Sequence, residues 1–211
     1  MLLRSHKDYD FEMVYFNADG EEGSMCGNGG RALVKFAFDL GIIGEECLFI
    51  ATDGEHVAKV DGELVHLKMV DVEGVEVTLE DYFMDTGSPH YVEFVNGDLN
   101  DYPVIVSGKE VRESSRFAPE GTNVNFVQKI SKKEIFVRTY ERGVENETLS
   151  CGTGVTACAI SSFLDKEMDS PIRIKTLGGQ LSVSFDATEE GFVNIYLIGP
   201  AEKVFEGKIN L

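Results

Sequence analysis

The sequence predicts an α+β protein made of two pseudo-symmetric halves, each a mainly antiparallel sheet packed around a central helix. Three observations predict this fold class. Short runs with the residue pattern of strands make up most of the 211 residues. Helical stretches interrupt these runs too seldom for regular βαβ alternation. A Cys-Gly-x-Gly segment occurs twice, at 26–29 and at 151–154, each time immediately before a helical stretch.

The first half begins inside a sheet and contains one helix. Residues 9–16 have the pattern of a strand that ends in a turn at 17–20. A helix is expected to begin right after Cys26 and to end at Gly41. Its apolar positions at helical spacing are Leu33, Phe36, Ala37 and Leu40. Further strands are expected near 47–51, 56–60 and 64–70, with a turn at 61–62.

The second half repeats this order of elements, but more strands and an additional helix precede its cysteine segment. We expect a strand over 83–95, a helix over 106–117, and strands over 123–130 and 134–141. A short helix follows Cys151, with Val155, Ala159 and Phe163 on one stripe. Strands over 172–176, 180–185 and 192–199 complete this half.

Aligning the two halves supports an internal repeat. Residues 26–29, Cys-Gly-Asn-Gly, align with 151–154, Cys-Gly-Thr-Gly, and Thr52-x-Gly54 aligns with Thr176-x-Gly178. An acidic segment without basic residues, near 72–82, is the expected linker. We therefore expect an N-terminal half over 1–79, completed by 203–211, and a C-terminal half over 80–202. Because residue 1 already lies inside a sheet, we expect the first half to be incomplete.

Composition and charge exclude several classes of partner. The chain has 19 basic and 37 acidic residues and a formal net charge of −18, which repels nucleic acids and anionic membranes. No apolar run is long enough for a membrane span, and the first residues lack a signal peptide's apolar core. We expect a cytoplasmic protein that binds neither nucleic acid nor membrane.

The cysteines and histidines do not form a metal-ligand pattern. The four cysteines, none in a CxxC pair, are expected to be thiols rather than disulfides. The four histidines are scattered, and there is no HExxH motif. No metal is expected. Cys47, beside two apolar residues, and Cys158, inside a helix, are expected to be small buried hydrophobes.

The repeated cysteine segment can support an acid–base reaction at carbon. A Cys-Gly-x-Gly segment at a helix start presents backbone N–H groups to an anion, and the positive helix end favours the thiolate. If a pseudo-twofold axis relates the halves, Cys26 and Cys151 face each other across one cleft. One sulfur would then remove the α-proton of an amino acid, and the other would return a proton to the opposite face. This scheme needs no cofactor.

Residues near the second cysteine fit a site for an amino acid. Glu141 suits an ammonium group, and Arg142 suits a carboxylate, although a solvated ion pair is the alternative. Asn17 and Asn123 either donate hydrogen bonds to a ligand or serve as turn residues. The segments GNGGRA and GTGVTA also fit the dinucleotide fingerprint G-x-G-x-x-A, but they lack βαβ flanks.

Four segments together, YFNADGEEGSMCGNGGRA, GSPHYV, GTNVNFV and YERGVENETLSCGTGVTA, resemble the diaminopimelate epimerase family. The resemblance covers essentially the whole chain in order. It implies an isomerase that epimerises LL- and meso-2,6-diaminopimelate by a pyridoxal-independent, two-base reaction in bacterial lysine and peptidoglycan biosynthesis. It also implies two similar α/β halves around a cleft, and a small amino-acid substrate as the partner.

The resemblance assigns roles residue by residue. Cys26 and Cys151 match the acid–base cysteines, and Glu141 matches the partner of the reacting ammonium. His90 matches a supporting histidine, for which a buried structural role is the alternative. The positions that match the backbone contacts of the α-carboxylate are Gly27, Asn28, Gly152 and Thr153. The positions that match contacts of the distal amino-acid end are Arg142, Asn17 and Asn123.

This chain departs from the family pattern at three points. Ser88 stands where the family commonly has asparagine, so no ligand role is assigned to it. One extra residue separates Glu141 from Cys151. The family's opening strands have no counterpart, so we expect the chain to be N-terminally truncated and to exchange the α-proton of its substrate weakly.

Other functions stay open at this stage. A proline or hydroxyproline racemase would share the paired cysteines, but Asn28 and the pair Glu141-Arg142 favour a substrate with two amino-acid ends. An inactive truncated fragment and a redox sensor with a Cys26–Cys151 disulfide are the alternatives from other classes. The sequence does not define the oligomeric state, and a homodimer is compatible with it.

Overall fold

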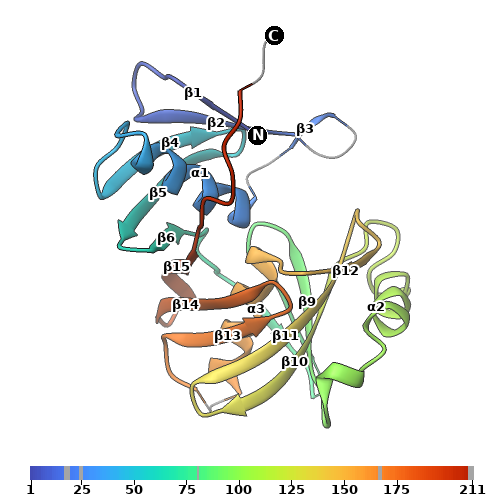
Figure 1. Ribbon diagram of the computed structural model, residues 1–211. Coiled ribbons are helices and arrows are strands. Elements are labelled where there is room, and N and C mark those ends of the chain that lie inside the picture. The colour runs from blue at the N-terminus through green and yellow to red at the C-terminus, as the bar shows by residue number, and fades with distance from the viewer. Residues whose placement is uncertain (17–19, 24–25, 80, 166–167, 209–211) are drawn as a thin grey trace. The chain divides into compact units, whose positions relative to one another are not determined.

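A computed structural model of the chain describes residues 1–16, 20–23, 26–79, 81–165 and 168–208. The chain divides into two compact units. Unit 1 comprises Met1–Lys68 and Ile198–Leu211, and unit 2 comprises Met69–Leu197. Each unit has its own group of neighbouring strands and its own central helix (Figure 1).

Unit 1 is a mainly antiparallel sheet with one helix on its face. Its helix is α1 (Gly27–Asp39), and its strands are β1 (Leu2–Arg4), β2 (Phe11–Phe16), β3 (Glu22–Gly23), β4 (Glu46–Ala51), β5 (Gly54–Asp61) and β6 (Leu64–Lys68). The strand order is β1-β2-β4-β5-β6, with β3 paired to β2. Only the pair β2–β4 is parallel among the pairs described within this unit. Helix α1 contacts β2, β5 and β6 (Figure 1).

Unit 2 contains the second central helix and a larger sheet. Its helices are η1 (Leu99–Asp101), α2 (Val104–Arg112) and α3 (Gly152–Leu164). Its strands are β7 (Val75–Val77), β8 (Asp81–Asp85), β9 (Pro89–Phe94), β10 (Asn123–Ser131), β11 (Glu134–Glu141), β12 (Asn146–Thr148), β13 (Ile172–Thr176), β14 (Gly179–Ala187) and β15 (Phe192–Pro200), whose last residues belong to unit 1. The strand order is β15-β14-β13-β11-β10-β9-β8-β7, with β12 paired to β11. The pairs β9–β10 and β11–β13 are parallel.

The strand pairing confirms the internal repeat. In both units an antiparallel strand pair is followed by a short third strand, a cysteine, a helix, and a strand parallel to the second strand of the pair. A hairpin with a positive-φ glycine comes next, at Gly54 (φ +124°) and Gly179 (φ +137°). Each glycine follows its cysteine by 28 residues, from 26 to 54 and from 151 to 179. The alignment of Thr52-x-Gly54 with Thr176-x-Gly178 was therefore wrong by one residue.

The two central helices are buried to different extents. Helix α3 has no charged residue, is buried almost all round, and contacts β8, β9, β10, β11, β13 and β14. Its expected single stripe was too narrow, because strands enclose it. Helix α1 buries Leu33, Val34 and Ala37, whereas Phe36 and Leu40, expected on the apolar stripe, are about half exposed at 50% and 57%. The buried face is thus rotated relative to the expected one.

Three predicted elements have different bounds in the structure. The strand expected over 83–95 is broken into β8 and β9 at Gly87, whose φ of +104° no strand accommodates. The helix expected over 106–117 is α2, which begins directly after Pro103 and ends at Arg112. The linker expected near 72–82 contains β7, which pairs with β8.

The unit boundaries also differ from the expected halves at 79/80 and 202/203. The structure divides the chain after Lys68 and after Leu197. Backbone bonds join Met69 to Ile195 and Val72 to Phe192, which attaches the start of the acidic segment to the second sheet. Arg116 then binds both Glu76 and Asp81 at 2.8 and 2.9 Å. The acidic segment is therefore part of unit 2.

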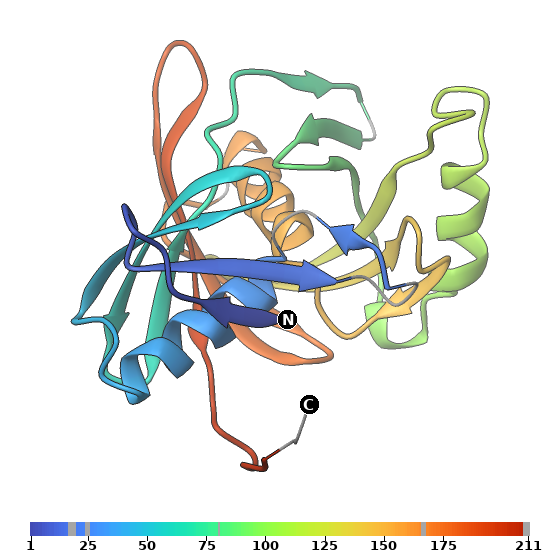
Figure 2. The same ribbon diagram turned by 90° about the horizontal axis from the view of Figure 1, so that it is seen from above.

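Helix α2 packs on the side of β10 and β11 opposite to α3 (Figures 1 and 2). The apolar residues beneath it form a cluster, here called the α2 cluster, of Tyr91, Leu99, Val104, Val124, Phe126, Phe136 and Tyr140. Because strand side chains alternate, the residues between these positions face α3. None of the helices described is long and apolar enough to cross a membrane.

Gly108 on α2 provides a test of this packing. A Cβ atom there would lie 2.4 Å from Cβ of Tyr140, so Gly108→Ala forces α2 away from β11. We expect the free energy of unfolding to fall by about 1–3 kcal/mol, although alanine favours a helix by about 1 kcal/mol. Urea unfolding measures the change. Val106→Ala, at a position 68% exposed on the same helix, is the matched control, and equal stability of the two variants would contradict the packing.

Candidate active site

Strand alternation places polar side chains on one face of the unit 2 sheet, toward α3. Alternate residues of β10 belong to the α2 cluster, so Asn123 and Asn125 point the other way. The register extends this polar face to both neighbouring strands, because Asn123 pairs with His90 of β9, and Asn125 pairs with Thr139 of β11. All four side chains are buried, with His90 and Asn125 at 0% exposure.

Cys151 immediately precedes α3, beside this polar face. It is the N-cap residue, with φ −117° and ψ 117°, and it is only partly buried. The first bond inside the helix runs from the N–H of Val155 to the carbonyl of Cys151. The preceding N–H groups therefore lie at the helix start, without an acidic residue in the first turn. This arrangement favours a bound carboxylate and a thiolate, as the sequence predicted.

Thr153 is the centre of a hydrogen-bonded group around this thiol. Its Oγ1 lies 3.4 Å from Sγ of Cys151, 2.8 Å from Nε2 of His90 and 3.2 Å from Oγ of Ser88. Ser88 Oγ also lies 3.0 Å from His90 Nε2. The backbone carbonyl of Thr153 accepts a bond of 2.9 Å from the hydroxyl of Thr86. Thr153 therefore joins the helix start to the polar face of the sheet through its side chain and its backbone.

Gly154 allows this close approach. A Cβ atom there would lie 2.5 Å from Oδ1 of Asn125 and 3.3 Å from Cε1 of His90. The second glycine of the repeated segment is therefore required by packing of the helix on the sheet, in addition to leaving room for a ligand.

Burial holds His90 in its neutral form. The pKa of His90 is lowered from 6.5 to about 3, chiefly because burial desolvates the ring and next because of the positive charge of Arg142. The ring therefore carries one proton at neutral pH, and it acts by hydrogen bonding rather than by charge.

Glu141 and Arg142 follow one another at the end of β11. Oε2 of Glu141 accepts a bond of 2.9 Å from the hydroxyl of Thr148. The backbone N–H of Arg142 donates to Oδ1 of Asn123 at 2.9 Å, and its guanidinium lies 3.4 Å from the carbonyl of Gly121. None of the ion pairs described joins the Glu141 carboxylate to the Arg142 guanidinium. The structure thus brings together in unit 2 a carboxylate, a guanidinium, a thiol and a neutral imidazole.

The first cysteine occupies the same backbone position in unit 1. Cys26 is the N-cap residue of α1, with φ −101° and ψ 123°, and is partly buried. Gly27 and Asn28 form the first turn. Arg31 folds back onto that turn, bonding the carbonyl of Gly27 at 3.2 Å and Oδ1 of Asn28 at 3.1 Å. Burial lowers the pKa of the Arg31 guanidinium, and the negative charge of a Cys26 thiolate would oppose this effect.

Sequence reasoning missed three polar residues of these sites. Arg31 is 6% exposed, and Asn125 and Thr139 are buried behind His90. The spacing of two from Asn123 to Asn125, on a strand, was a signal for the second asparagine. Asn17, a predicted ligand residue, lies outside the described residues.

The other two cysteines differ from the N-cap pair, as expected. Burial raises the pKa of Cys47 to about 11 and raises that of Cys158 well above its usual value. Both are therefore protonated thiols in apolar surroundings. All four cysteines are free. Within the described part of the chain, histidine, cysteine and acidic side chains form no group of three or more that could bind a metal ion.

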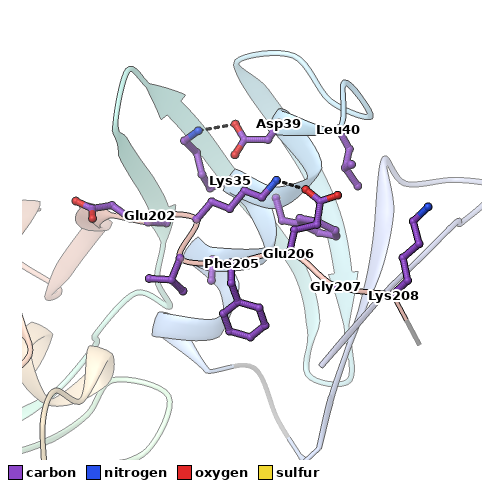
Figure 3. A pocket seen from close by; sticks show the side chains of 13 residues that line it. Lys35, Asp39, Leu40, Glu202, Phe205, Glu206, Gly207 and Lys208 are labelled. Carbon is purple, nitrogen blue, oxygen red and sulfur yellow. Dashed lines mark hydrogen bonds and ion pairs between the residues drawn. The ribbon is translucent and has the colours of Figure 1, made fainter. Parts of the chain in front are cut away.

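A pocket in unit 1 lies along α1 and is not part of the predicted site. Its walls are the exposed side of the helix and the segment 201–208, and Figure 3 shows Lys35 paired with Asp39 at its edge. Phe36 and Leu40 contribute its apolar helix side. The N-cap cysteine and the first turn of α1 do not line it.

The neutral state of His90 predicts a specific dependence of stability on pH. The unfolded chain takes up a proton near pH 6.5, whereas folded His90 resists protonation down to about 3. The stabilisation is therefore complete above pH 6.5 and is lost as pH falls toward 3. Within that window His90 contributes a slope of about 1.4 kcal/mol per pH unit.

Urea unfolding of the unaltered protein and of His90→Gln at several pH values measures this slope as the difference between them. The subtraction removes the contributions of the carboxylates, which both proteins share. Identical slopes for the two proteins would show that His90 titrates normally in the folded state.

Comparisons with known proteins give a consistent family for this chain. The family model described as diaminopimelate epimerase matches residues 82–204. A diaminopimelate epimerase of Flavobacterium psychrophilum is 46% identical over 211 residues, covering 99% of this chain and 82% of that protein.

Two solved structures share the fold. A PhzF-family phenazine biosynthesis protein of Bacillus anthracis has a TM-score of 0.75 at 14% identity, over 94% of this chain and 80% of that one. A probable proline racemase of Agrobacterium radiobacter, with bound carbonate, has a TM-score of 0.67 at 17% identity, over 94% and 72%. These two likenesses concern the fold alone. The family match and the curated relative decide the assignment: the chain belongs to the diaminopimelate epimerase family.

Proposed function

We propose that this protein epimerises LL-2,6-diaminopimelate to the meso form with two cysteine bases and without a cofactor. The observation that supports it best is the repeated backbone position of Cys26 and Cys151. Each is the N-cap of a helix that begins with Gly-x-Gly, in a matching order of strands. The family of the chain supports the substrate and the reaction class.

The proposed reaction moves one proton off and one proton onto the α-carbon. A cysteine thiolate takes the α-proton and becomes a thiol, and the electron pair left on carbon spreads into the α-carboxylate. The second cysteine, a thiol, gives its proton to the opposite face and becomes a thiolate. Backbone N–H groups of the helix starts, at Gly27, Asn28, Gly152 and Thr153, stabilise the developing charge on the carboxylate.

The polar residues of unit 2 suit the remaining groups of the substrate. We assign the reacting ammonium to Glu141, whose side chain is only partly buried at the end of β11. We assign the distal carboxylate to Arg142, whose backbone is fixed by Asn123. Asn17 completes the distal contacts in this proposal. His90 supports Cys151 through Thr153.

The reaction also suggests a cellular setting. We place the protein in the cytoplasm, in the supply of lysine and of peptidoglycan precursors. The net charge of −18 favours a small zwitterionic substrate over nucleic acid or an anionic membrane as partner.

Replacing each N-cap cysteine tests the two-base reaction. Cys26→Ala and Cys151→Ala should each lower the rate of conversion of LL- to meso-diaminopimelate by about 100-fold or more, because each direction needs both a base and an acid. Chromatographic separation of the isomers, with deuterium incorporation from D₂O followed by mass spectrometry, measures both steps.

Cys158→Ala is the matched control, since this thiol is fully buried in α3, and it should retain turnover. L-Proline serves as the competing substrate. Full turnover in either N-cap variant, or racemisation of proline in place of diaminopimelate, would refute the proposed reaction.

Arg142 should determine affinity for the distal end of the substrate. Arg142→Gln removes a charge-assisted bond to a carboxylate and should raise KM for meso-diaminopimelate by about 10–100-fold, with a smaller effect on kcat. Steady-state kinetics separate the two parameters. Arg173→Gln, at an arginine side chain that is 62% exposed on β13, is the control, and the same KM in both variants would exclude this role for Arg142.

A further inference from the structure

The sheet holds the amide of Asn125 in a single orientation. Its Nδ2 lies 2.8 Å from the carbonyl of Tyr91, which can only accept, so the nitrogen and not the oxygen faces that carbonyl. Its Oδ1 accepts a bond of 3.0 Å from the hydroxyl of Thr139 on the neighbouring strand. Both bonds are buried. A reversed amide would set two acceptors against each other at Tyr91.

This orientation determines the tautomer of His90. Nδ1 of the ring lies 3.1 Å from Nδ2 of Asn125, and an amide nitrogen only donates, so Nδ1 accepts. A fully buried, neutral ring has one proton, which must then be on Nε2. Nε2 lies 2.8 Å from Oγ1 of Thr153 and 3.0 Å from Oγ of Ser88, and we assign its proton to the nearer oxygen, that of Thr153.

The remaining donors direct the proton of Thr153. Oγ of Ser88 accepts a bond from Nδ2 of Asn123 at 3.4 Å. The proton of the Ser88 hydroxyl is therefore available to donate to Oγ1 of Thr153 at 3.2 Å. The two acceptor positions of the threonine oxygen are then filled by His90 and Ser88. Its own proton points to Sγ of Cys151, at 3.4 Å.

We propose that Asn125, held by Thr139, is a positioning residue that acts on Cys151 through His90 and Thr153. By fixing the proton of His90 on Nε2, it makes the threonine hydroxyl a donor to the cysteine sulfur and so stabilises the thiolate. The importance of this effect for the reaction rests on the proposed function of Cys151 as a base. The relay itself lies wholly within unit 2.

The tautomer is measured directly in the unaltered protein. Nitrogen-15 NMR of histidine-labelled protein, with the His90 signals assigned by their loss in His90→Gln, distinguishes protonated from unprotonated ring nitrogens. We expect an unprotonated Nδ1 and a protonated Nε2 at neutral pH. A proton on Nδ1 would overturn the proposal without any variant.

Alkylation of Cys151 by iodoacetamide, followed by mass spectrometry of its peptide, measures the thiolate as a function of pH. Asn125→Leu and Thr139→Val should move the midpoint of the pH–rate profile up by about one unit, which makes alkylation about tenfold slower at neutral pH. Thr139→Ser keeps the hydroxyl and should restore the unaltered profile. Thr188→Val, which loses an exposed hydroxyl bond to the carbonyl of Gly191 in the turn between β14 and β15, should leave the profile unchanged.

Circular dichroism verifies that each variant is folded. If Asn125→Leu does not fold, the alkylation profile of Thr139→Val and the tautomer of His90 in the unaltered protein test the proposal. An unchanged midpoint in the folded Asn125 or Thr139 variants overturns this inference. Diaminopimelate turnover by the unaltered protein is measured in parallel. Its absence, with the tautomer and the alkylation shifts as expected, would refute the proposed function while leaving the relay established.

Discussion

The structure of the site depends on the contact between the first turn of α3 and the polar face of β9 and β10. Gly154 has no side chain to separate them, and a Cβ there would lie 2.5 Å from Oδ1 of Asn125. The close approach brings Thr153 within hydrogen-bond distance of His90 and keeps Cys151 at the open end of the helix. The close packing of the helix on the sheet and the hydrogen bonding to the thiol therefore depend on the same steric constraint.

Much of the fold was predictable because the repeat is local in sequence. The cysteine segments mark the starts of both central helices, and the strands around them follow period-2 alternation. The α+β class and the first residues of α1 and α3 were therefore predicted correctly. The buried face of α1 was predicted only in part, since Leu33 and Ala37 are buried as expected. Arg31 and Val34 are buried beside them, where the pattern favoured Phe36 and Leu40. The break between β8 and β9 at Gly87 was not predicted, because it depends on a positive φ angle that a glycine permits but does not require.

The residues that we propose to react were named from the sequence, whereas the buried residues that support them were not. Cysteine, glutamate and arginine near glycine-rich helix starts indicate chemistry by residue type alone. Asn125 and Thr139 carry no such signal, since buried asparagine and threonine are also ordinary structural residues. Their role depends on two registers, β9 with β10 and β10 with β11, that bring residues 90, 125 and 139 side by side. Strand register is a long-range property that alternation within one strand does not determine.

The two cysteines share a backbone position but have different polar support. The first turn at Cys26 is held by Arg31, a buried cation bonded to Gly27 and Asn28. The first turn at Cys151 is held by a neutral imidazole through a threonine hydroxyl. A cation stabilises a thiolate by a field that acts at any orientation, whereas a hydroxyl does so only when its proton points to sulfur. Orientation must therefore be fixed around Cys151, and the buried amide of a β10 asparagine supplies the constraint.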